Sequence, residues 1–227
     1  MSLFRYTSSL FLLAALSLTC ARPEKAEEPK IFGNLYVRYL QDGGQIKAEA
    51  SFFEGDSAHL AQPISIPGGV SFQGSGMESR NIQDKLIRYQ YENRLDYPGK
   101  FAFQVQDEAG QSHRFAQEMP PVFDFLIPSS FSKKQGMDLE LQPPPSSPEE
   151  ELALLFSDTT GKASLIEIPA PISQKISLSH EQLSKLSPGP NQLYLVKKKR
   201  TISQEGPYRI HFDMEFYTTV KEALVLD

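Results

Sequence analysis

The stretch QIKAEASFF, residues 45–53, decides the fold class. Its apolar side chains fall at every second position, at Ile46, Ala48, Ala50 and Phe52, and most of the positions between them are polar. Because successive side chains of a strand point to opposite faces, the stretch predicts a strand with one buried face. Related strand patterns recur at Ile87–Tyr91, Phe101–Val105, Leu139–Leu141, Leu152–Phe156, Leu193–Leu195 and Ile210–Phe216.

Turn residues separate these stretches. Asp107–Gly110, Asp158–Gly161 and Ser203–Gly206 each begin with Asp or Ser and end with Gly, which is typical of hairpin turns. Asp42-Gly43-Gly44 indicates a similar reversal after Leu35–Leu40. Short strands with regularly spaced turns predict an all-β sandwich.

One short helix is expected within this β pattern. His180–Leu186 predicts one or two helical turns, because Ser179 can cap the first turn and Gln182 can reach back to complete a capping box. Pro143–Pro148 contains four prolines and predicts an extended, stiff loop between strands.

A weak internal repeat indicates two domains. Pro98-Gly99 precedes an apolar strand and the Asp107–Gly110 turn, and ninety residues later Pro188-Gly189 precedes a similar strand and the Ser203–Gly206 turn. This period suits two sandwiches of about 100 residues each. We expect the joint at Met119-Pro120-Pro121, since consecutive prolines stiffen the chain. The expected domains are therefore residues 32–121 and 122–227.

The end of the first repeat resembles the last hairpin of immunoglobulin-like domains. Gly99-Lys100-Phe101-Ala102-Phe103 matches the Gly-x-aromatic-x-apolar pattern of that hairpin, and the second copy carries two extra residues. The Trp and the paired Cys of antibody domains are absent from the sequence. The resemblance implies two tandem immunoglobulin-like β-sandwich domains without indicating a specific family.

The N-terminal residues predict export. Arg5 precedes the apolar run Leu10–Leu18, which is about half as long as the ~20 residues of a membrane-spanning helix. Leu16-Ser17-Leu18-Thr19-Cys20 resembles a lipobox, in which a peptidase cleaves before a Cys that carries lipid. The resemblance implies a bacterial lipoprotein with a signal peptide at residues 1–19 and lipidation of Cys20. The charged residues and prolines that follow Cys20 predict a flexible tether through residue 31. The alternative is ordinary secretory cleavage after Ala21, which would give a secreted soluble protein.

Charge and cysteine content restrict the partners. Removal of residues 1–19 takes one of the 23 basic residues, Arg5, and leaves 22 against 28 acidic residues, a net charge of −6. This acidic balance argues against a nucleic acid partner. No second cysteine is present, so stability has to come from core burial and not from a disulfide. The expected partners are a membrane, through the N-terminal lipid, and an envelope protein.

No motif indicates catalysis. The histidines, His59, His113, His180 and His211, are far apart and form neither H-E-x-x-H nor H-x-H. Gly74-Ser75-Gly76 lacks the spacing of a nucleophile elbow. We therefore expect no catalytic, cofactor-binding or metal-binding residues, and a protein that is not an enzyme.

The expected function is a non-catalytic binding or structural accessory of a larger envelope assembly. One alternative is a carbohydrate-binding module that stacks sugars on tyrosines, because the chain has no Trp; the candidates are Tyr89, Tyr91, Tyr97, Tyr194, Tyr208 and Tyr217. A second alternative is a hydrolase with paired carboxylates. The basic run Lys197–Arg200 is interpreted as an exposed cluster that protects a strand edge.

Overall fold

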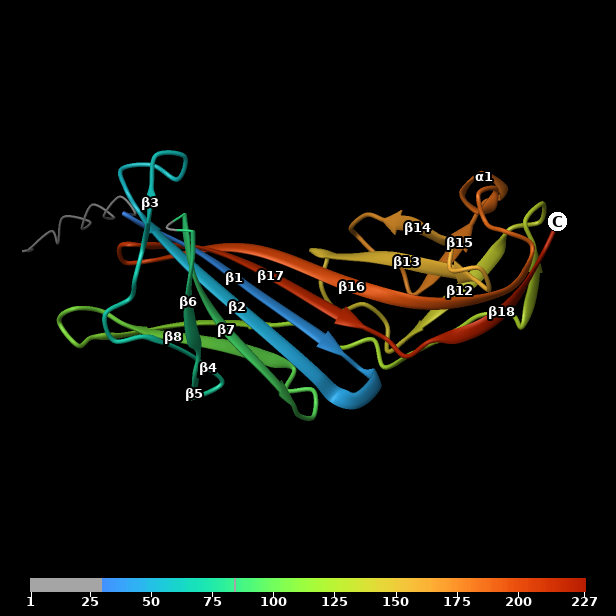
Figure 1. The fold of residues 1–227 in the computed structure, drawn as a ribbon. Helices are drawn as coiled ribbons and strands as arrows, with labels where there is room; N and C mark the ends of the chain where they lie inside the picture. The colour runs from blue at the N-terminus through green and yellow to red at the C-terminus, as the bar shows by residue number, and fades with distance from the viewer. Residues whose placement is uncertain (1–29, 84) are drawn as a thin grey trace, which may run out of the picture.

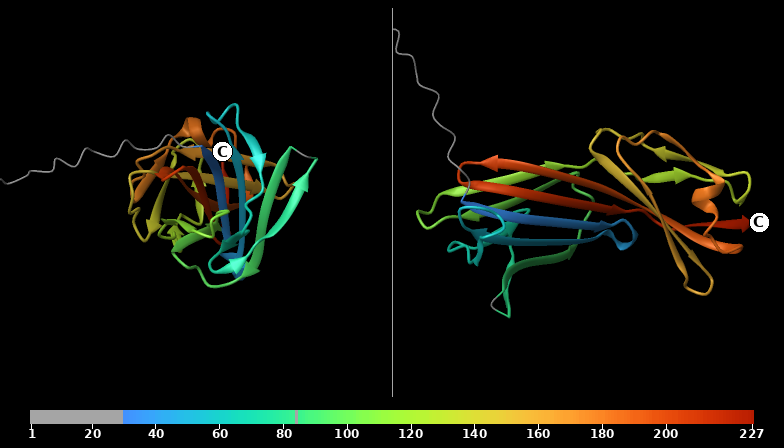
Figure 2. Two further views of the ribbon diagram at one scale, coloured as in Figure 1. Left: turned by 90° about the vertical axis from the view of Figure 1, so that its left-hand side faces the viewer. Right: turned by 90° about the horizontal axis from the view of Figure 1, so that it is seen from above.

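The computed structural model describes residues 30–83 and 85–227 and confirms the all-β prediction. The described residues form eighteen strands, a short 3-10 helix η1 (Asp42–Gly44) and one helix α1 (His180–Leu183). Two packed units lie end to end in an elongated molecule (Figures 1 and 2).

One continuous sheet of eleven strands extends through both units. Its path is β11-β18-β16-β17-β1-β2-β7-β6, and β13, β14 and β3 pair beside this path. The bounds of these strands are β1 (Ile31–Leu40), β2 (Gln45–Glu54), β3 (Gln62–Ile64), β6 (Glu78–Ile82), β7 (Leu86–Arg94), β11 (Ser130–Ser132), β13 (Glu150–Asp158), β14 (Ala163–Ile168), β16 (Gly189–Glu205), β17 (Tyr208–Tyr217) and β18 (Lys221–Leu226).

A smaller sheet covers the inner face of the continuous sheet in each unit. In the first unit the order is β5-β4-β8-β9, and in the second it is β10-β12-β15. The bounds are β4 (Val70–Phe72), β5 (Ser75–Gly76), β8 (Lys100–Gln106), β9 (Ser112–Glu118), β10 (Asp124–Leu126), β12 (Met137–Gln142) and β15 (Lys175–Leu178). Each unit is therefore a sandwich, as expected from the alternating pattern.

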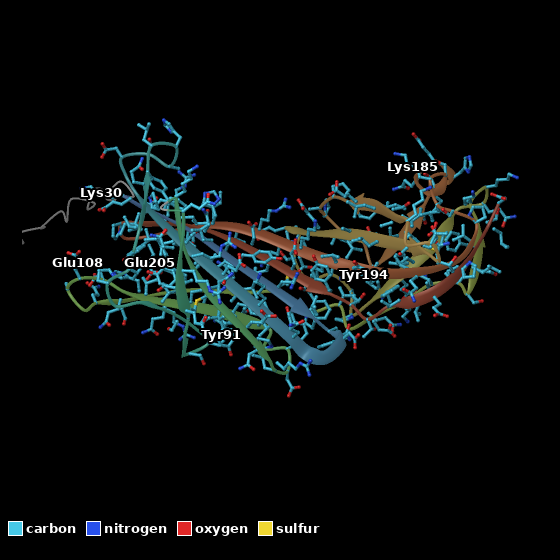
Figure 3. All side chains as sticks on the ribbon, viewed as in Figure 1. Lys30, Tyr91, Glu108, Lys185, Tyr194 and Glu205 are labelled. Carbon is cyan, nitrogen blue, oxygen red and sulfur yellow. The ribbon has the colours of Figure 1, made fainter. Side chains whose placement is uncertain are left out.

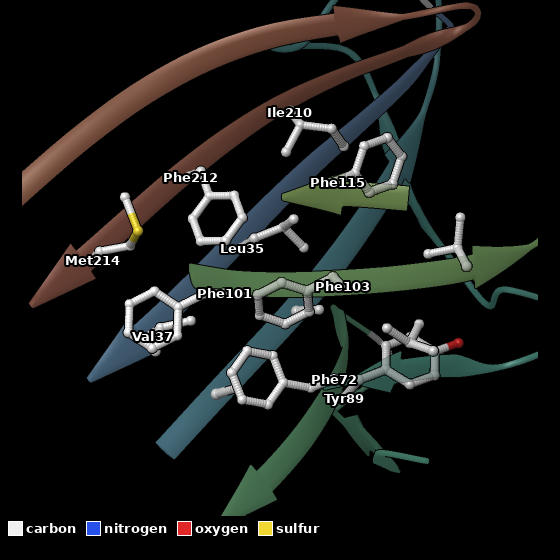
Figure 4. Close-up of a cluster of buried hydrophobic side chains, with 14 of the residues drawn as sticks. Leu35, Val37, Phe72, Tyr89, Phe101, Phe103, Phe115, Ile210, Phe212 and Met214 are labelled. Carbon is white, nitrogen blue, oxygen red and sulfur yellow. The ribbon is translucent and has the colours of Figure 1, made fainter. Parts of the chain in front are cut away.

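The first core confirms the predicted alternation. Ile46, Ala48, Ala50 and Phe52 of β2 are at most 1% exposed, and they face Phe101 and Phe103 of β8. Figure 4 shows these rings packed among side chains from β1, β4, β7 and β17. Full burial of a large side chain such as Ile46 or Phe52 contributes about 1.5–3 kcal/mol, so the inward positions of the strands stabilise this unit.

The second core contains apolar residues of β10, β12, β13, β16 and β18 together with Leu183 of α1. The predicted capping box is confirmed, since Ser179 Oγ accepts a hydrogen bond from Gln182 N and Gln182 Oε1 accepts one from Ser179 N. The helix ends at Leu183, three residues earlier than the expected range. The core members include Phe125, Leu139, Leu141, Leu152, Leu154, Phe156, Leu193 and Leu195.

The two cores do not follow the expected division of the chain at residue 121. Before residue 121 the buried core residues belong to the first core, with Met119 as the last of them, and the second core begins at Val122. However, β17, which falls in the range expected for the second domain, pairs in parallel with β1 and packs into the first core. Alternation identifies β17 as a strand with one buried face, but it does not identify the sheet that β17 joins.

Two of the expected hairpin turns form as predicted. In Asp107–Gly110 and Asp158–Gly161 the Gly N donates to the Asp carbonyl oxygen at 3.0 Å. Each Asp side chain also accepts a backbone N–H further along the turn, from Gln111 at 2.8 Å and from Lys162 at 3.0 Å. The carboxylates of Asp107 and Asp158 therefore stabilise their own turns.

The third hairpin is present, but its turn lies further along the chain than expected. Ser203 remains within β16, and the register pairs Glu205 with Tyr208. Gly206 and Pro207 make the loop, and Gly206 adopts a φ of +54°. Glycine tolerates this left-handed conformation, so the reversal occurs at Gly206 and β16 is correspondingly longer.

Candidate functional site

The outer face of the continuous sheet carries a cluster of aromatic and charged side chains, which we name the tyrosine face. It consists of Tyr36 and Arg38 of β1, Tyr194 of β16, and Glu215 and Tyr217 of β17. In β1 the neighbouring residues enter the core, so Tyr36 and Arg38 point outward. The register places Arg38 opposite Glu215. All five side chains are half-buried, and Tyr194 lies along β16 (Figure 3).

Glu215 organises the tyrosine face. Its Oε2 accepts hydrogen bonds from Tyr36 Oη at 2.8 Å and from Tyr217 Oη at 2.9 Å. Burial, followed by the hydrogen bond to Glu215, raises the pKa of Tyr217 to about 12 and raises the pKa of Tyr36 as well. Both hydroxyls are therefore neutral donors at neutral pH, and the rings are held in fixed positions.

The remaining members add a second ring and a cation. The ring centroids of Tyr194 and Tyr217 are 6.1 Å apart, with an angle of 35° between the planes. Arg38 Nε is buried and has no hydrogen-bond partner among the described residues. A half-exposed pair of rings beside a carboxylate and a guanidinium can stack against a flat apolar surface and hydrogen-bond to polar groups around it.

The structure separates the six tyrosines that were candidates for sugar stacking. Tyr194 and Tyr217 lie on the tyrosine face, but Tyr89 and Tyr208 are at most 2% exposed in the first core. The remaining two are half-buried against the first core: the Tyr97 hydroxyl donates to the Met119 carbonyl, and Tyr91 packs against Phe72. Four of the six candidate tyrosines therefore pack in or against the first core and do not lie on the tyrosine face.

Sequence reasoning missed Tyr36 as a member of the tyrosine face. The signal was present, because Leu35, Val37 and Tyr39 alternate as inward residues and leave Tyr36 on the opposite face. The partner of Tyr36, Glu215, is 179 positions away in the sequence, and alternation alone cannot bring β1 and β17 together.

The interpretation of Lys197–Arg200 as an exposed cluster on a strand edge is wrong for Lys197 and Lys199, whereas Arg200 is exposed. The run lies within β16, which has neighbouring strands on both sides, and Lys197 is only 2% exposed. Lys197 Nζ lies 2.8 Å from Glu150 Oε2 and donates to the Pro120 carbonyl oxygen at 2.5 Å. Lys199 Nζ donates to the Glu118 carbonyl oxygen at 3.1 Å. Strand alternation turns these two lysines inward at the junction between the cores.

His113 and Asp107 meet beside the first core. His113 Nε2 lies 3.2 Å from Asp107 Oδ2, and its ring packs 4.7 Å from the ring of Tyr208. Within residues 30–83 and 85–227, no three His, Cys, Asp or Glu side chains are placed to hold a metal ion. Cys20, the expected lipidation site, lies outside the described residues. In the described part of the chain, no helix has the length and apolar character needed to cross a bilayer.

Comparisons with known proteins give only distant similarity. No family model matches the sequence, and no curated protein matches it. One solved structure, a tetra-tandem repeat in the extending region of a large adhesion protein, is 13% identical with a TM-score of 0.28, and the alignment covers 86% of this chain and 49% of that one. Another, from work on host cell surface retention of a 1.5-MDa bacterial ice-binding adhesin, is 10% identical with a TM-score of 0.22, covering 88% and 66%. This chain spans about half the length of the first and about two thirds of the second, and the similarity is too low to assign a family.

Proposed function

We propose that the protein is a lipid-anchored, non-catalytic module of a bacterial cell envelope, in which two sandwiches form a stiff rod for binding or structural support. The observation that carries the proposal is that β16 belongs to both sandwiches. Its 17 residues pair with β13 and β18 in the second unit and with β17 toward the first. At ~3.3 Å per residue, the strand is about 56 Å long, so a continuous strand joins the two units in addition to any flexible segment.

Polar contacts at the junction support a fixed angle between the units. The buried Lys197–Glu150 pair is hydrogen-bonded to the chain between the cores through Pro120. On the other side, Gln41 Nε2 donates to the Phe123 carbonyl at 2.9 Å, and Gln41 Oε1 accepts from Thr219 N at 3.2 Å. Bending the molecule would break these contacts as well as the ladder of β16.

The ends of the rod are suited to display. Lys30, the first described residue, lies at one end together with Glu108 and Glu205, and Lys185 lies at the opposite end (Figure 3). An anchor at Cys20 would therefore hold the first sandwich near the membrane and direct the second sandwich away from it. This geometry supports a role in presenting a surface and does not require a catalytic centre.

The anchor is tested by replacing Cys20 with Ser and following detergent partitioning and the intact mass in a bacterial host. We expect the wild-type protein to partition into detergent with the added mass of the lipid, and the variant to remain aqueous. Equal partitioning would contradict the anchor. Stiffness is tested separately, with spin labels on the two sandwiches of a soluble Cys20→Ser protein, and a broad distance distribution would contradict the rod.

A second candidate function, carbohydrate binding, is favoured by the gathering of three tyrosines on the tyrosine face. Sugar rings stack on aromatic side chains, and Glu215 and Arg38 offer an acceptor and a donor beside them. The test is a glycan array with the wild-type protein and with the variant Tyr194→Ala. The Tyr194 ring lies in the cluster, and its hydroxyl makes no hydrogen bond within the described part of the chain, so the substitution leaves the other contacts intact. Binding that Tyr194→Ala abolishes would support this function, and absence of binding to any glycan would exclude it.

A further inference from the structure

A groove in the second sandwich lies between β14 and the segment that follows α1. Its volume is about 760 Å³. One side consists of residues 162–166, which include most of β14, and the other side consists of Gln182 and residues 184–188. Ile166 and Leu186 are almost fully buried members of the second core, and the rest of the lining is a mixture of polar and apolar residues. This volume is within the range of sites that hold drug-sized ligands or short peptides.

The edge of β14 that borders the groove has no strand partner. Among the described residues β14 pairs only with β13. Asp158 N donates to the Lys162 carbonyl at the hairpin end, so residues 164, 166 and 168 turn their backbone groups toward β13 in the antiparallel alternation. Ala163, Leu165 and Glu167 therefore direct their N–H and C=O groups to the open edge. An unpaired strand edge is a template for another strand.

Two lysines give the groove a positive charge. Lys162 and Lys185 line it, both are exposed, and neither has an ion pair in the described part of the chain. The nearest turn carboxylate, Asp158, already accepts hydrogen bonds from Thr160 and from Lys162 N. Leu165, on the same strand, has an apolar side chain that is 55% exposed. The groove thus combines two free cations, an exposed apolar side chain and a row of backbone groups.

We infer that this groove binds an extended, acidic peptide segment of a partner protein, which adds to β14 as an extra strand. Backbone hydrogen bonds to the open edge supply affinity, and alternate side chains of the peptide meet Leu165 and the lysines. Residues 162–166 extend ~16 Å at the rise of a strand, enough for about five peptide residues. The inference is independent of the proposed anchor, because the groove lies wholly within the second sandwich.

Backbone pairing is tested with a fluorescent octapeptide of alternating valine and glutamate. The protein variants are Leu165→Pro, which removes the outward N–H, and Leu165→Ala, which removes the side chain and keeps that N–H. Proline is tolerated at edge positions whose N–H does not join the ladder. We expect Leu165→Pro to weaken binding about tenfold or more, and Leu165→Ala to weaken it much less. Equal affinities for the two variants would overturn strand addition.

Charge preference is tested with the double variant Lys162→Glu, Lys185→Glu and with an octapeptide of alternating valine and lysine. We expect the double variant to lose affinity for the acidic peptide, by about threefold to tenfold, and to gain affinity for the basic one. Lys85→Glu, an exposed lysine in the first sandwich, is the matched control and should change neither. An unchanged preference in the double variant would overturn the acidic assignment.

A direct measurement covers the case in which Leu165→Pro fails to fold. Hydrogen exchange of the wild-type protein, followed residue by residue with the acidic peptide bound, should slow at the amides of Ala163, Leu165 and Glu167. Amides of Ser164 and Ile166, already in the β13 ladder, should change less. Absence of binding by the acidic peptide, or binding without protection at the three outward amides, would refute the inference.

Discussion

The buried pair Lys197–Glu150 provides the sharpest test of how the two sandwiches are held. Lys197 is 2% exposed and Glu150 is fully buried, with 2.8 Å between Lys197 Nζ and Glu150 Oε2. Lys197→Met keeps the length of the side chain and removes its charge. The carboxylate of Glu150 then stays buried without a cation, and the Pro120 carbonyl loses its donor.

The expected cost follows from this geometry. Breaking a buried ion pair by removing one partner destabilises a protein by about 3–5 kcal/mol, because the other charge remains uncompensated. This is a large part of the ~5–15 kcal/mol that keeps a typical protein folded. Burial lowers the pKa of Lys197 in spite of the opposing effect of Glu150, which indicates that desolvation offsets much of the attraction. The double variant Glu150→Leu, Lys197→Met should therefore recover most of the loss.

The assay is urea unfolding at neutral pH, followed by circular dichroism, on a soluble form that begins at Ala21. Lys198→Met is the matched control, since Lys198 is the next residue of β16, is half-exposed and points to the outer face. It should change stability by no more than about 0.5 kcal/mol. The reasoning is refuted if Lys197→Met costs less than about 1 kcal/mol, or if the double variant is no more stable than the single one.

Three further predictions concern other parts of the molecule. The pKa of Tyr217 is raised from an ordinary value of 10.0 to about 12 in the folded protein, so the protonated hydroxyl stabilises the fold fully below pH 10.0. This stabilisation is lost as the pH rises through the folded pKa. Tyr217→Phe should therefore flatten the decline of the free energy of unfolding between pH 10.0 and about 12. Gly33→Ala would place Cβ 2.5 Å from Ile210 Cδ1, which is fully buried, and should cost about 1–3 kcal/mol in urea unfolding, whereas a neutral effect would show that the core yields. Gln41→Ala removes both side-chain hydrogen bonds that Gln41 makes across the junction, so it should broaden the distance distribution between spin labels on the two units; an unchanged distribution would show that the stiffness does not depend on Gln41.

Local patterns in the sequence predicted most of the strands and their buried faces. Ile46, Ala48, Ala50 and Phe52 are buried as the alternation requires, and the same holds for the inward residues of β8 and β17. The capping box at Ser179 and the Asp–Gly turns were also predictable, because each depends on side chains within a few residues of one another.

Partners far apart in the sequence could not be predicted. The parallel pairing of β1 with β17, and the extension of β16 through both sandwiches, depend on which sheet edge a strand joins. The alternation of apolar and polar residues does not determine that choice. Lys197 illustrates the difference, since a run of four basic residues suggests a solvated surface until two strands flank it and Glu150 faces it. The tyrosine face was found only in part for the same reason, because Tyr36 and Glu215 meet through that parallel pair.

The parallel pairing of β1 with β17 also sets an order of events during synthesis and folding. The first described strand, beginning at Ile31, finds its neighbour only when Tyr208 and the residues after it are present. A polypeptide that is synthesised from its N-terminus therefore holds Leu35 and Val37 uncovered on one side until β17 has emerged. Such an intermediate exposes an open apolar sheet edge, which can pair with another chain until β17 covers it. Closure of the first sandwich thus waits for a strand that follows most of the second sandwich in the sequence.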